Sequence, residues 1–257
     1  MRWIAPRDRA ATLSRMSKRN EPGPGALARQ HAPTSSAGEI SAFLSDARRL
    51  EAIAPERAGR LVFALDATMS RQPTWDLAAE VQAGMFESAA QIGGLAVQLV
   101  YYRGFGECRA SRWVGDAREL KAMMARISVR GGRTQIGRVL AHVRTEASRS
   151  PVAALVFVGD AFEEPIDPVC ATAGELGLLN TKVFMFHEGG DPAAAGAFAE
   201  IARLAGGAAM RFDASAPASL ASLLRAVAAY AAGGRAALQR LAQGDREARR
   251  LIAAMPQ

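Results

Sequence analysis

The feature that most constrains the fold of this chain is a regular alternation between short apolar runs and longer amphipathic segments. Five apolar runs have the composition of buried β-strands, namely Leu61–Leu65, Ala96–Tyr102, Ala153–Gly159, Lys182–His187 and Ala208–Phe212. Helical periodicity fills the intervals, at about 74–92, 116–127, 135–148, 169–178, 192–205 and 217–231. A more polar segment, Glu107–Val114, is predicted to pair with the second strand as an antiparallel edge strand. Strands that alternate with long helices predict a doubly wound α/β fold, in which a mostly parallel six-stranded sheet carries helices on both faces.

The two ends of the chain lie outside this alternation. Residues 1–34 combine Pro, Gly, Arg and Ser without periodicity, which predicts a flexible basic arm. Ser36 and Glu39 form a capping-box pattern, so 35–59 is predicted to be an N-terminal helix and linker. The α/β domain is then expected over 60–231, and 232–257 is expected to be a helical extension whose last helix is capped by Asp245.

Charge and composition limit the classes of function. The formal net charge is +7, but residues 61–230 are nearly neutral, so nucleic acid is expected at most at the basic arm. No apolar run approaches the ~20 residues that span a bilayer, so no membrane span is predicted. The two cysteines, Cys108 and Cys170, form no CxxC motif, which is typical of a reducing, cytoplasmic location. The three histidines share no metal-ligand spacing, so no zinc site is expected.

Side chains with oxygen atoms occur in three loops, two after predicted strands and one before a predicted helix. Asp66, Thr68 and Ser70 follow the first strand, Thr134 precedes a helix in RGGRTQIG, and Asp160 follows the strand Ala153–Gly159. In an open parallel sheet, ligands bind beyond the carboxyl ends of the strands. Two carboxylates and three hydroxyls are hard ligands that suit Mg²⁺ or Mn²⁺. These loops therefore predict a divalent-cation site.

The three loops resemble the metal-ion-dependent adhesion site (MIDAS) of the von Willebrand factor A (vWA) domain, whose usual pattern is DxSxS…T…D. The resemblance covers about residues 60–231, and it carries the ligand roles to the five residues just named. Three departures remain: Thr68 replaces the commoner Ser, Arg133 separates the glycines from Thr134, and Gly159 precedes Asp160 instead of following it. The resemblance implies that hydroxyls bind the metal directly and that carboxylates often act through water. An open coordination position then takes an acidic side chain of a partner, and no reaction follows.

Further residues near this rim are candidates for partner contact. They are Arg71, Trp75, Arg133 and Glu163. With 29 arginines and only three lysines, the chain is typical of a GC-rich bacterial genome. Intracellular vWA proteins often act with AAA+ ATPases or chaperone-type assembly factors, so the resemblance implies a partner of that class.

Other interpretations of the same residues stay open at this point. Asp66 or Thr134 taken alone could be a helix cap. Asp66 could also be the nucleophile of a haloacid-dehalogenase-like phosphatase, with Asp160 in an acidic motif that holds Mg²⁺. Against the phosphatase, Thr68 stands where its acid/base carboxylate is expected, and no lysine is well placed to stabilise a phosphoaspartate.

Overall fold

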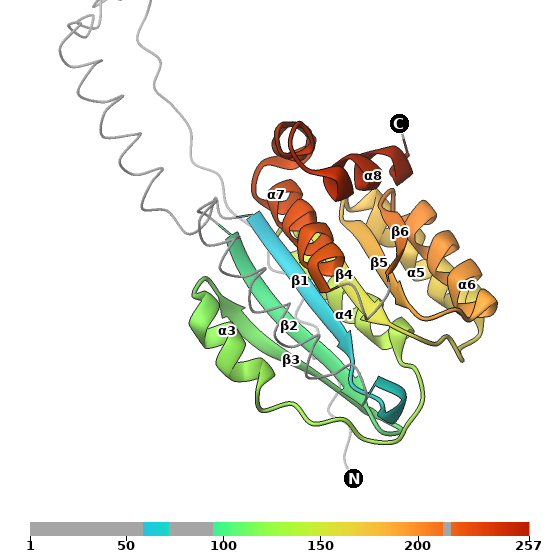
Figure 1. Ribbon diagram of the computed structural model, residues 1–257. Helices are drawn as coiled ribbons and strands as arrows, with labels where there is room; N and C mark the ends of the chain where they lie inside the picture. Colours follow the sequence, from blue (N-terminus) through green and yellow to red (C-terminus); the bar gives the residue numbers. More distant parts are fainter. Residues whose placement is uncertain (1–58, 72–94, 213–216, 257) are drawn as a thin grey trace, which may run out of the picture. The chain divides into compact units, whose positions relative to one another are not determined.

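A computed structural model describes residues 59–71, 95–212 and 217–256 of the chain (Figure 1). The predicted arm at 1–34, the N-terminal helix and linker up to residue 58, and the predicted helix at 74–92 lie outside the described residues.

The core is a six-stranded sheet in the order β3-β2-β1-β4-β5-β6. Its strands are β1 (Gly59–Asp66), β2 (Leu95–Arg103), β3 (Glu107–Val114), β4 (Ala154–Gly159), β5 (Lys182–Glu188) and β6 (Ala208–Phe212). Every neighbouring pair is parallel except β2 and β3, which are antiparallel. The predicted strands and the antiparallel edge are therefore confirmed, with ends that move by one or two residues.

Helices cover both faces of the sheet, as predicted. They are α3 (Ala117–Met124), α4 (Ile136–Arg149), α5 (Ile166–Leu178), α6 (Pro192–Leu204), α7 (Pro217–Ala242) and α8 (Arg246–Ala254). One hydrophobic cluster joins the strands to α3, α7 and α8, and a second joins them to α4, α5 and α6. Alternate residues of each strand supply the two clusters: Phe63 enters the first and Val62 the second.

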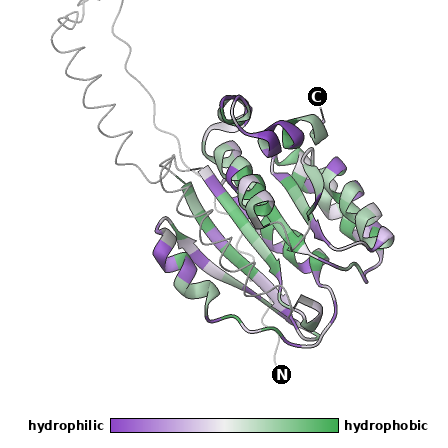
Figure 2. Cartoon of the chain, viewed as in Figure 1, coloured by the Kyte–Doolittle hydropathy of each residue, from purple (hydrophilic) through white to green (hydrophobic). Residues whose placement is uncertain are grey.

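The central strands are buried on both faces, which explains their continuous apolar runs. All six residues of β4 are buried, and Figure 2 shows the central strands as hydrophobic along most of their length. The edge strand β3 is instead exposed or half-buried except at Val114, and its exposed residues include Arg109 and Arg112. Charged side chains on an edge strand discourage pairing with another chain.

The expected C-terminal helical extension is present. The backbone of α7 leaves helical geometry at Gly233 and Gly234, and Gly234 has a φ of +63°, which favours glycine. Asp245 caps α8 by accepting a hydrogen bond from the Ala248 N–H at 3.0 Å. Leu238 and Leu251 are fully buried in the same cluster as the strands. Among the described residues, no helix combines the length and the apolar character that crossing a bilayer requires.

The strand order places the sheet's topological switch point between β1 and β4. The chain winds from β1 outward to β2 and β3 on one side, and from β4 outward to β5 and β6 on the other. Their connections diverge at the carboxyl ends of β1 and β4, where ligands bind in open α/β sheets. Asp66 is the last residue of β1 and Asp160 directly follows β4.

Candidate metal centre

Asp66 lies in the interior at the carboxyl end of β1. Its side chain is fully buried. One carboxylate oxygen, Oδ1, accepts the Thr68 N–H at 2.8 Å, and the other accepts the Tyr102 hydroxyl at 2.8 Å. Burial raises the pKa of Asp66, and the negative charge of Asp160 adds to the rise; the hydrogen bonds from Thr68 and Tyr102 offset only part of it. The charged carboxylate is therefore destabilised here, and a nearby cation would relieve that.

Thr68 and Ser70 present their hydroxyls side by side after β1. Their Oγ atoms lie 3.0 Å apart, within hydrogen-bond distance. Thr68 is buried, whereas Ser70 is exposed in the short 3₁₀ turn η2 (Met69–Arg71). The two hydroxyls therefore converge on one another where the buried strand end meets the surface.

Asp160 follows β4 next to Asp66. Leu65 of β1 pairs with Val158 of β4, and a Cβ added to Gly159 would lie 3.5 Å from the Asp66 Cβ. The Oδ1 atom of Asp160 is buried and has no hydrogen-bond partner in the part of the chain that the structure describes. Buried polar atoms are nearly always satisfied, so this oxygen is an unexplained acceptor.

Thr134 is fixed by the loop that follows β4. Its hydroxyl accepts the Glu163 N–H at 2.9 Å, and its own N–H donates to the Glu163 carboxylate at 3.1 Å. The segment before it runs along the loop after β1, because the Arg130 N–H donates to the Ala67 carbonyl at 3.0 Å. These contacts bring the Thr134 loop and the Thr68 loop to the same edge of the sheet.

Thr134, which taken alone could have been a helix cap, is not the N-cap of α4. The helix α4 begins at Ile136, its N-cap is Gln135, and that residue makes no capping hydrogen bond with its side chain. The Glu164 carboxylate instead accepts the N–H groups of both Ile136 and Gly137. Glu164 reaches this position from the loop after β4, so it ties that loop to the start of α4.

The fold of this chain has counterparts among known proteins, although its sequence matches none of the families compared. Neither protein-family sequence models nor curated protein sequences match the chain. Solved structures do match. They include a von Willebrand factor type A protein from Catenulispora acidiphila, with a TM-score of 0.56, 19% identity and coverage of 68% of this chain and 43% of that one. The SpRpn10 VWA domain matches with a TM-score of 0.52 and 11% identity over 63% of this chain and 95% of that one. This chain has the fold of a vWA domain.

A third match with the vWA fold is a structure that contains a metal ion. It is proximal thread matrix protein 1 from the mussel byssus with a zinc-occupied MIDAS motif, with a TM-score of 0.54 and 15% identity. The match covers 66% of this chain and 48% of that protein, so this chain spans less than half the length of two of the three structures named.

The described residues of this vWA fold offer an oxygen-based site. Among them, no group of three His, Cys, Asp or Glu side chains lies close enough to hold a metal. Two carboxylates and three hydroxyls lie on the segments at this edge: Asp66, Thr68 and Ser70 at the end of β1, Asp160 after β4, and Thr134 bonded to the loop after β4. Such a set fits a hard cation with water completing its coordination.

The structure describes the four predicted partner-contact residues to different extents. Trp75 lies outside the described residues, and of Arg71 only the backbone position in η2 is described. Arg133 is exposed, and its N–H donates to the Gly104 carbonyl at 3.2 Å. Glu163 is exposed as a residue but bonds to Thr134, so its role within the domain is to hold that threonine.

The environment of Asp66 disfavours the phosphatase alternative. A nucleophilic carboxylate needs an oxygen that can approach the substrate phosphorus. Asp66 is fully buried and both of its oxygens accept hydrogen bonds within the domain. The arrangement suits a supporting carboxylate better than an attacking one.

Sequence reasoning missed two residues of this centre, Tyr102 and Glu164. Tyr102 is fully buried and its hydroxyl holds Asp66, while Glu164 holds the start of α4. The signal for Tyr102 is its place at the end of the predicted second strand, opposite Asp66 in the β1–β2 register.

Proposed function

We propose that this chain is a non-enzymatic protein-binding domain that holds Mg²⁺ or Mn²⁺ and takes an acidic side chain of a partner protein on that ion. The residues that would hold the ion are Asp66, Thr68, Ser70, Thr134 and Asp160. The bound cation would supply an open coordination position for the partner's carboxylate.

The observation that carries this proposal is the unpaired, buried Oδ1 of Asp160, whose negative charge helps to raise the pKa of the buried Asp66. Two adjacent acids at a buried edge repel one another unless a positive charge lies between or beside them. No basic side chain hydrogen-bonds to either carboxylate among the described residues. The vWA fold and the zinc-occupied motif of the mussel protein support a cation in this place.

The hydroxyls keep the capacity to bind an ion directly. A hydroxyl oxygen carries two lone pairs. Among the described residues, the Thr134 oxygen accepts one hydrogen bond, from the Glu163 N–H, so an acceptor lone pair remains within that part of the chain. The mutual hydrogen bond of Thr68 and Ser70 likewise leaves an acceptor lone pair on each oxygen. The two carboxylates would act on the ion partly through water, as the resemblance to the MIDAS implies.

The partner class follows from the resemblance and the composition. The abundance of arginine over lysine supports a bacterial protein, and a cytoplasmic vWA protein of that kind would act with an AAA+ ATPase or a chaperone-type assembly factor. Arg71, Trp75 and Arg133 are proposed to contact that partner around the metal.

Isothermal titration calorimetry tests the metal site. Mg²⁺ and Mn²⁺ are titrated into the wild type and into the Asp66→Ala, Thr134→Ala and Asp160→Ala variants. Glu175→Ala and Thr145→Ala are matched controls, because they remove an exposed carboxylate late in α5 and an exposed hydroxyl late in α4, away from the helix ends that adjoin the proposed ligands. We expect binding to be lost in the three site variants and kept in the two controls. Intact binding in Thr134→Ala would show that the ligand set is wrong.

A phosphatase assay on the same proteins separates the two functional hypotheses. We expect no metal-stimulated hydrolysis of p-nitrophenyl phosphate by the wild type. Turnover that requires Mg²⁺ and disappears in Asp66→Ala would overturn the non-enzymatic proposal and favour Asp66 as a nucleophile.

A further inference from the structure

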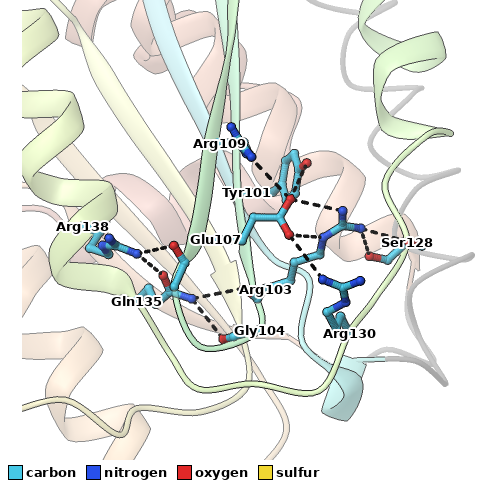
Figure 3. Close-up of polar contacts among 10 residues, drawn as sticks. Tyr101, Arg103, Gly104, Glu107, Arg109, Ser128, Arg130, Gln135 and Arg138 are labelled. Carbon is cyan, nitrogen blue, oxygen red and sulfur yellow. Dashed lines mark hydrogen bonds and ion pairs between the residues drawn. The ribbon is translucent and has the colours of Figure 1, made fainter.

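The tip of the β2–β3 hairpin holds an aromatic side chain out in solvent. Phe105 is 83% exposed. The carbonyl groups of the glycines on either side are anchored to the start of α4. Gly104 accepts the Gln135 amide at 3.2 Å, and Gly106 accepts the Arg138 guanidinium at 2.6 Å (Figure 3). Because the turn is held in place, little backbone freedom would be lost when Phe105 contacts a partner.

Next to this tip, one carboxylate faces three guanidinium groups. We name Arg103, Glu107, Arg109 and Arg130 the Glu107 cluster (Figure 3). Arg103 binds Glu107 closely, with its Nε at 3.0 Å, and is largely covered. Arg109 and Arg130 lie at 3.8 and 3.9 Å from the carboxylate, and their side chains are 71% and 69% exposed. The cluster therefore keeps an excess of positive charge on two exposed and loosely held arginines.

The Glu107 cluster is continuous with the proposed metal site. Arg130 forms an isolated parallel bridge with Thr68, and its N–H donates to the Ala67 carbonyl. The same loop approaches the hairpin tip closely: a Cβ on Gly132 would lie 2.1 Å from the Gly104 carbonyl oxygen. One backbone segment thus links Thr68, the cluster and the tip, so the cluster adjoins the loop that carries two of the proposed metal ligands.

The two segments that meet at the hairpin tip are basic although the domain as a whole is nearly neutral. Residues 103–109 and 130–138 contain five Arg and one Glu. An exposed surface of this sign attracts acidic partners and repels basic ones.

We infer that Phe105, Arg109 and Arg130 form a second contact surface for the partner, which receives an acidic protein segment bearing a large apolar side chain. The inference extends the proposed function, because the same segment would place one carboxylate on the metal. A protein segment is favoured over nucleic acid because the adjoining metal site is proposed for a side-chain carboxylate.

Fluorescence anisotropy on the full-length chain tests this inference. The probe is a fluorescein-labelled synthetic peptide of aspartates around one phenylalanine, in excess Mg²⁺ at low ionic strength. We expect the double variant Arg109→Ala/Arg130→Ala to weaken binding roughly tenfold, since each exposed charge contributes modestly. The matched control is Arg118→Ala/Lys121→Ala, which removes two exposed charges on α3 and is expected to change the affinity less than twofold. Equal loss in both double variants would overturn the inference.

The role of Phe105 is tested with a second peptide in which alanine replaces phenylalanine. Phe105→Ala is expected to weaken the phenylalanine peptide to the affinity of the alanine peptide and to leave the alanine peptide unchanged. Equal affinity of the wild type for the two peptides would overturn the apolar part of the inference.

Two further measurements separate this inference from the proposed function. If chelation by EDTA and Asp66→Ala leave peptide binding intact while Arg109→Ala/Arg130→Ala weakens it, the second surface stands and the metal proposal fails. Metal-dependent binding that the arginine variant does not weaken overturns the second surface alone. An oligothymidylate probe that binds through the same arginines more tightly than the peptide would also overturn it, in favour of nucleic acid.

Discussion

The Tyr102 hydroxyl donates a 2.8 Å hydrogen bond to Oδ2 of Asp66, and both side chains are fully buried. The two residues are direct neighbours in the parallel register of β1 and β2. Burial raises the pKa of Tyr102 well above its usual range, and the nearby charge of Asp66 adds to the rise, so the phenol stays a donor. Tyr102 therefore fixes the orientation of Asp66 and leaves its Oδ1 to the Thr68 N–H.

Replacing Tyr102 with Phe is expected to destabilise the domain by about 1–3 kcal/mol, because a buried carboxylate oxygen loses its donor. Metal affinity is expected to fall about tenfold or more, as for other residues that orient a ligand. Urea denaturation and calorimetry measure the two effects. Tyr101→Phe is the control, since the Tyr101 hydroxyl makes only a 3.4 Å contact with Glu107. Unchanged stability in Tyr102→Phe would contradict the argument.

Much of this fold could be predicted from the sequence because local patterns determine it. The buried strands are continuous apolar runs, and Asp245 and Gly234 mark the C-terminal helices where the structure has them. Asp66 and Asp160 could be predicted to meet because both follow strands of one parallel sheet, and β1 and β4 do pair.

What the sequence could not supply is contact between residues distant along the chain. The pairing of Asp66 with Tyr102 depends on the register between two strands, and a one-residue shift would turn Tyr102 to the other face. Glu164 caps α4 from another loop, so no local capping pattern reveals it. The excess of positive charge at the hairpin tip was not evident because the charge of 61–230 is nearly balanced in sum, and the two basic segments 103–109 and 130–138 are separated along the chain.

The close approach of Gly132 to Gly104 gives a prediction with a built-in control. A Cβ on Gly132 would lie 2.1 Å from the Gly104 carbonyl oxygen, a distance that forces the backbone to move. Gly131 is the adjacent residue and has nothing within 4 Å of such a Cβ. We expect Gly132→Ala to lower the free energy of unfolding by about 1–3 kcal/mol and to weaken Mg²⁺ binding, because Thr134 moves with the loop. Gly131→Ala is expected to change neither, and comparable losses in the two variants would contradict the prediction.

Removal of the Glu164 carboxylate is also expected to destabilise the domain at the start of α4. This carboxylate accepts the first two N–H groups of α4, in place of a side chain at the N-cap. Glu164→Ala leaves both groups without that partner and is expected to cost about 0.5–2 kcal/mol, the range for loss of a helix cap. Thermal unfolding measures the change. Glu175→Ala, which removes an exposed partner of Arg144 in a surface ion pair, should cost less, and the reverse order would contradict this account.

The half-buried His142 predicts a dependence of stability on pH. Its Nε2 lies 2.8 Å from Oε1 of Gln98, and burial lowers the pKa of His142 below its usual 6.5, with Arg149 acting in the same direction and Glu146 opposing. The unfolded chain therefore binds a proton at a higher pH than the folded chain does. Stability from this group is complete above pH 6.5 and falls as the pH drops below that value toward the folded pKa.

Urea denaturation between pH 8 and pH 5 should show this decline, and His142→Gln should flatten it. Asp245, whose folded pKa lies below 3.8, contributes its own loss only at more acidic pH, so an undiminished slope in His142→Gln would show that another group causes the decline.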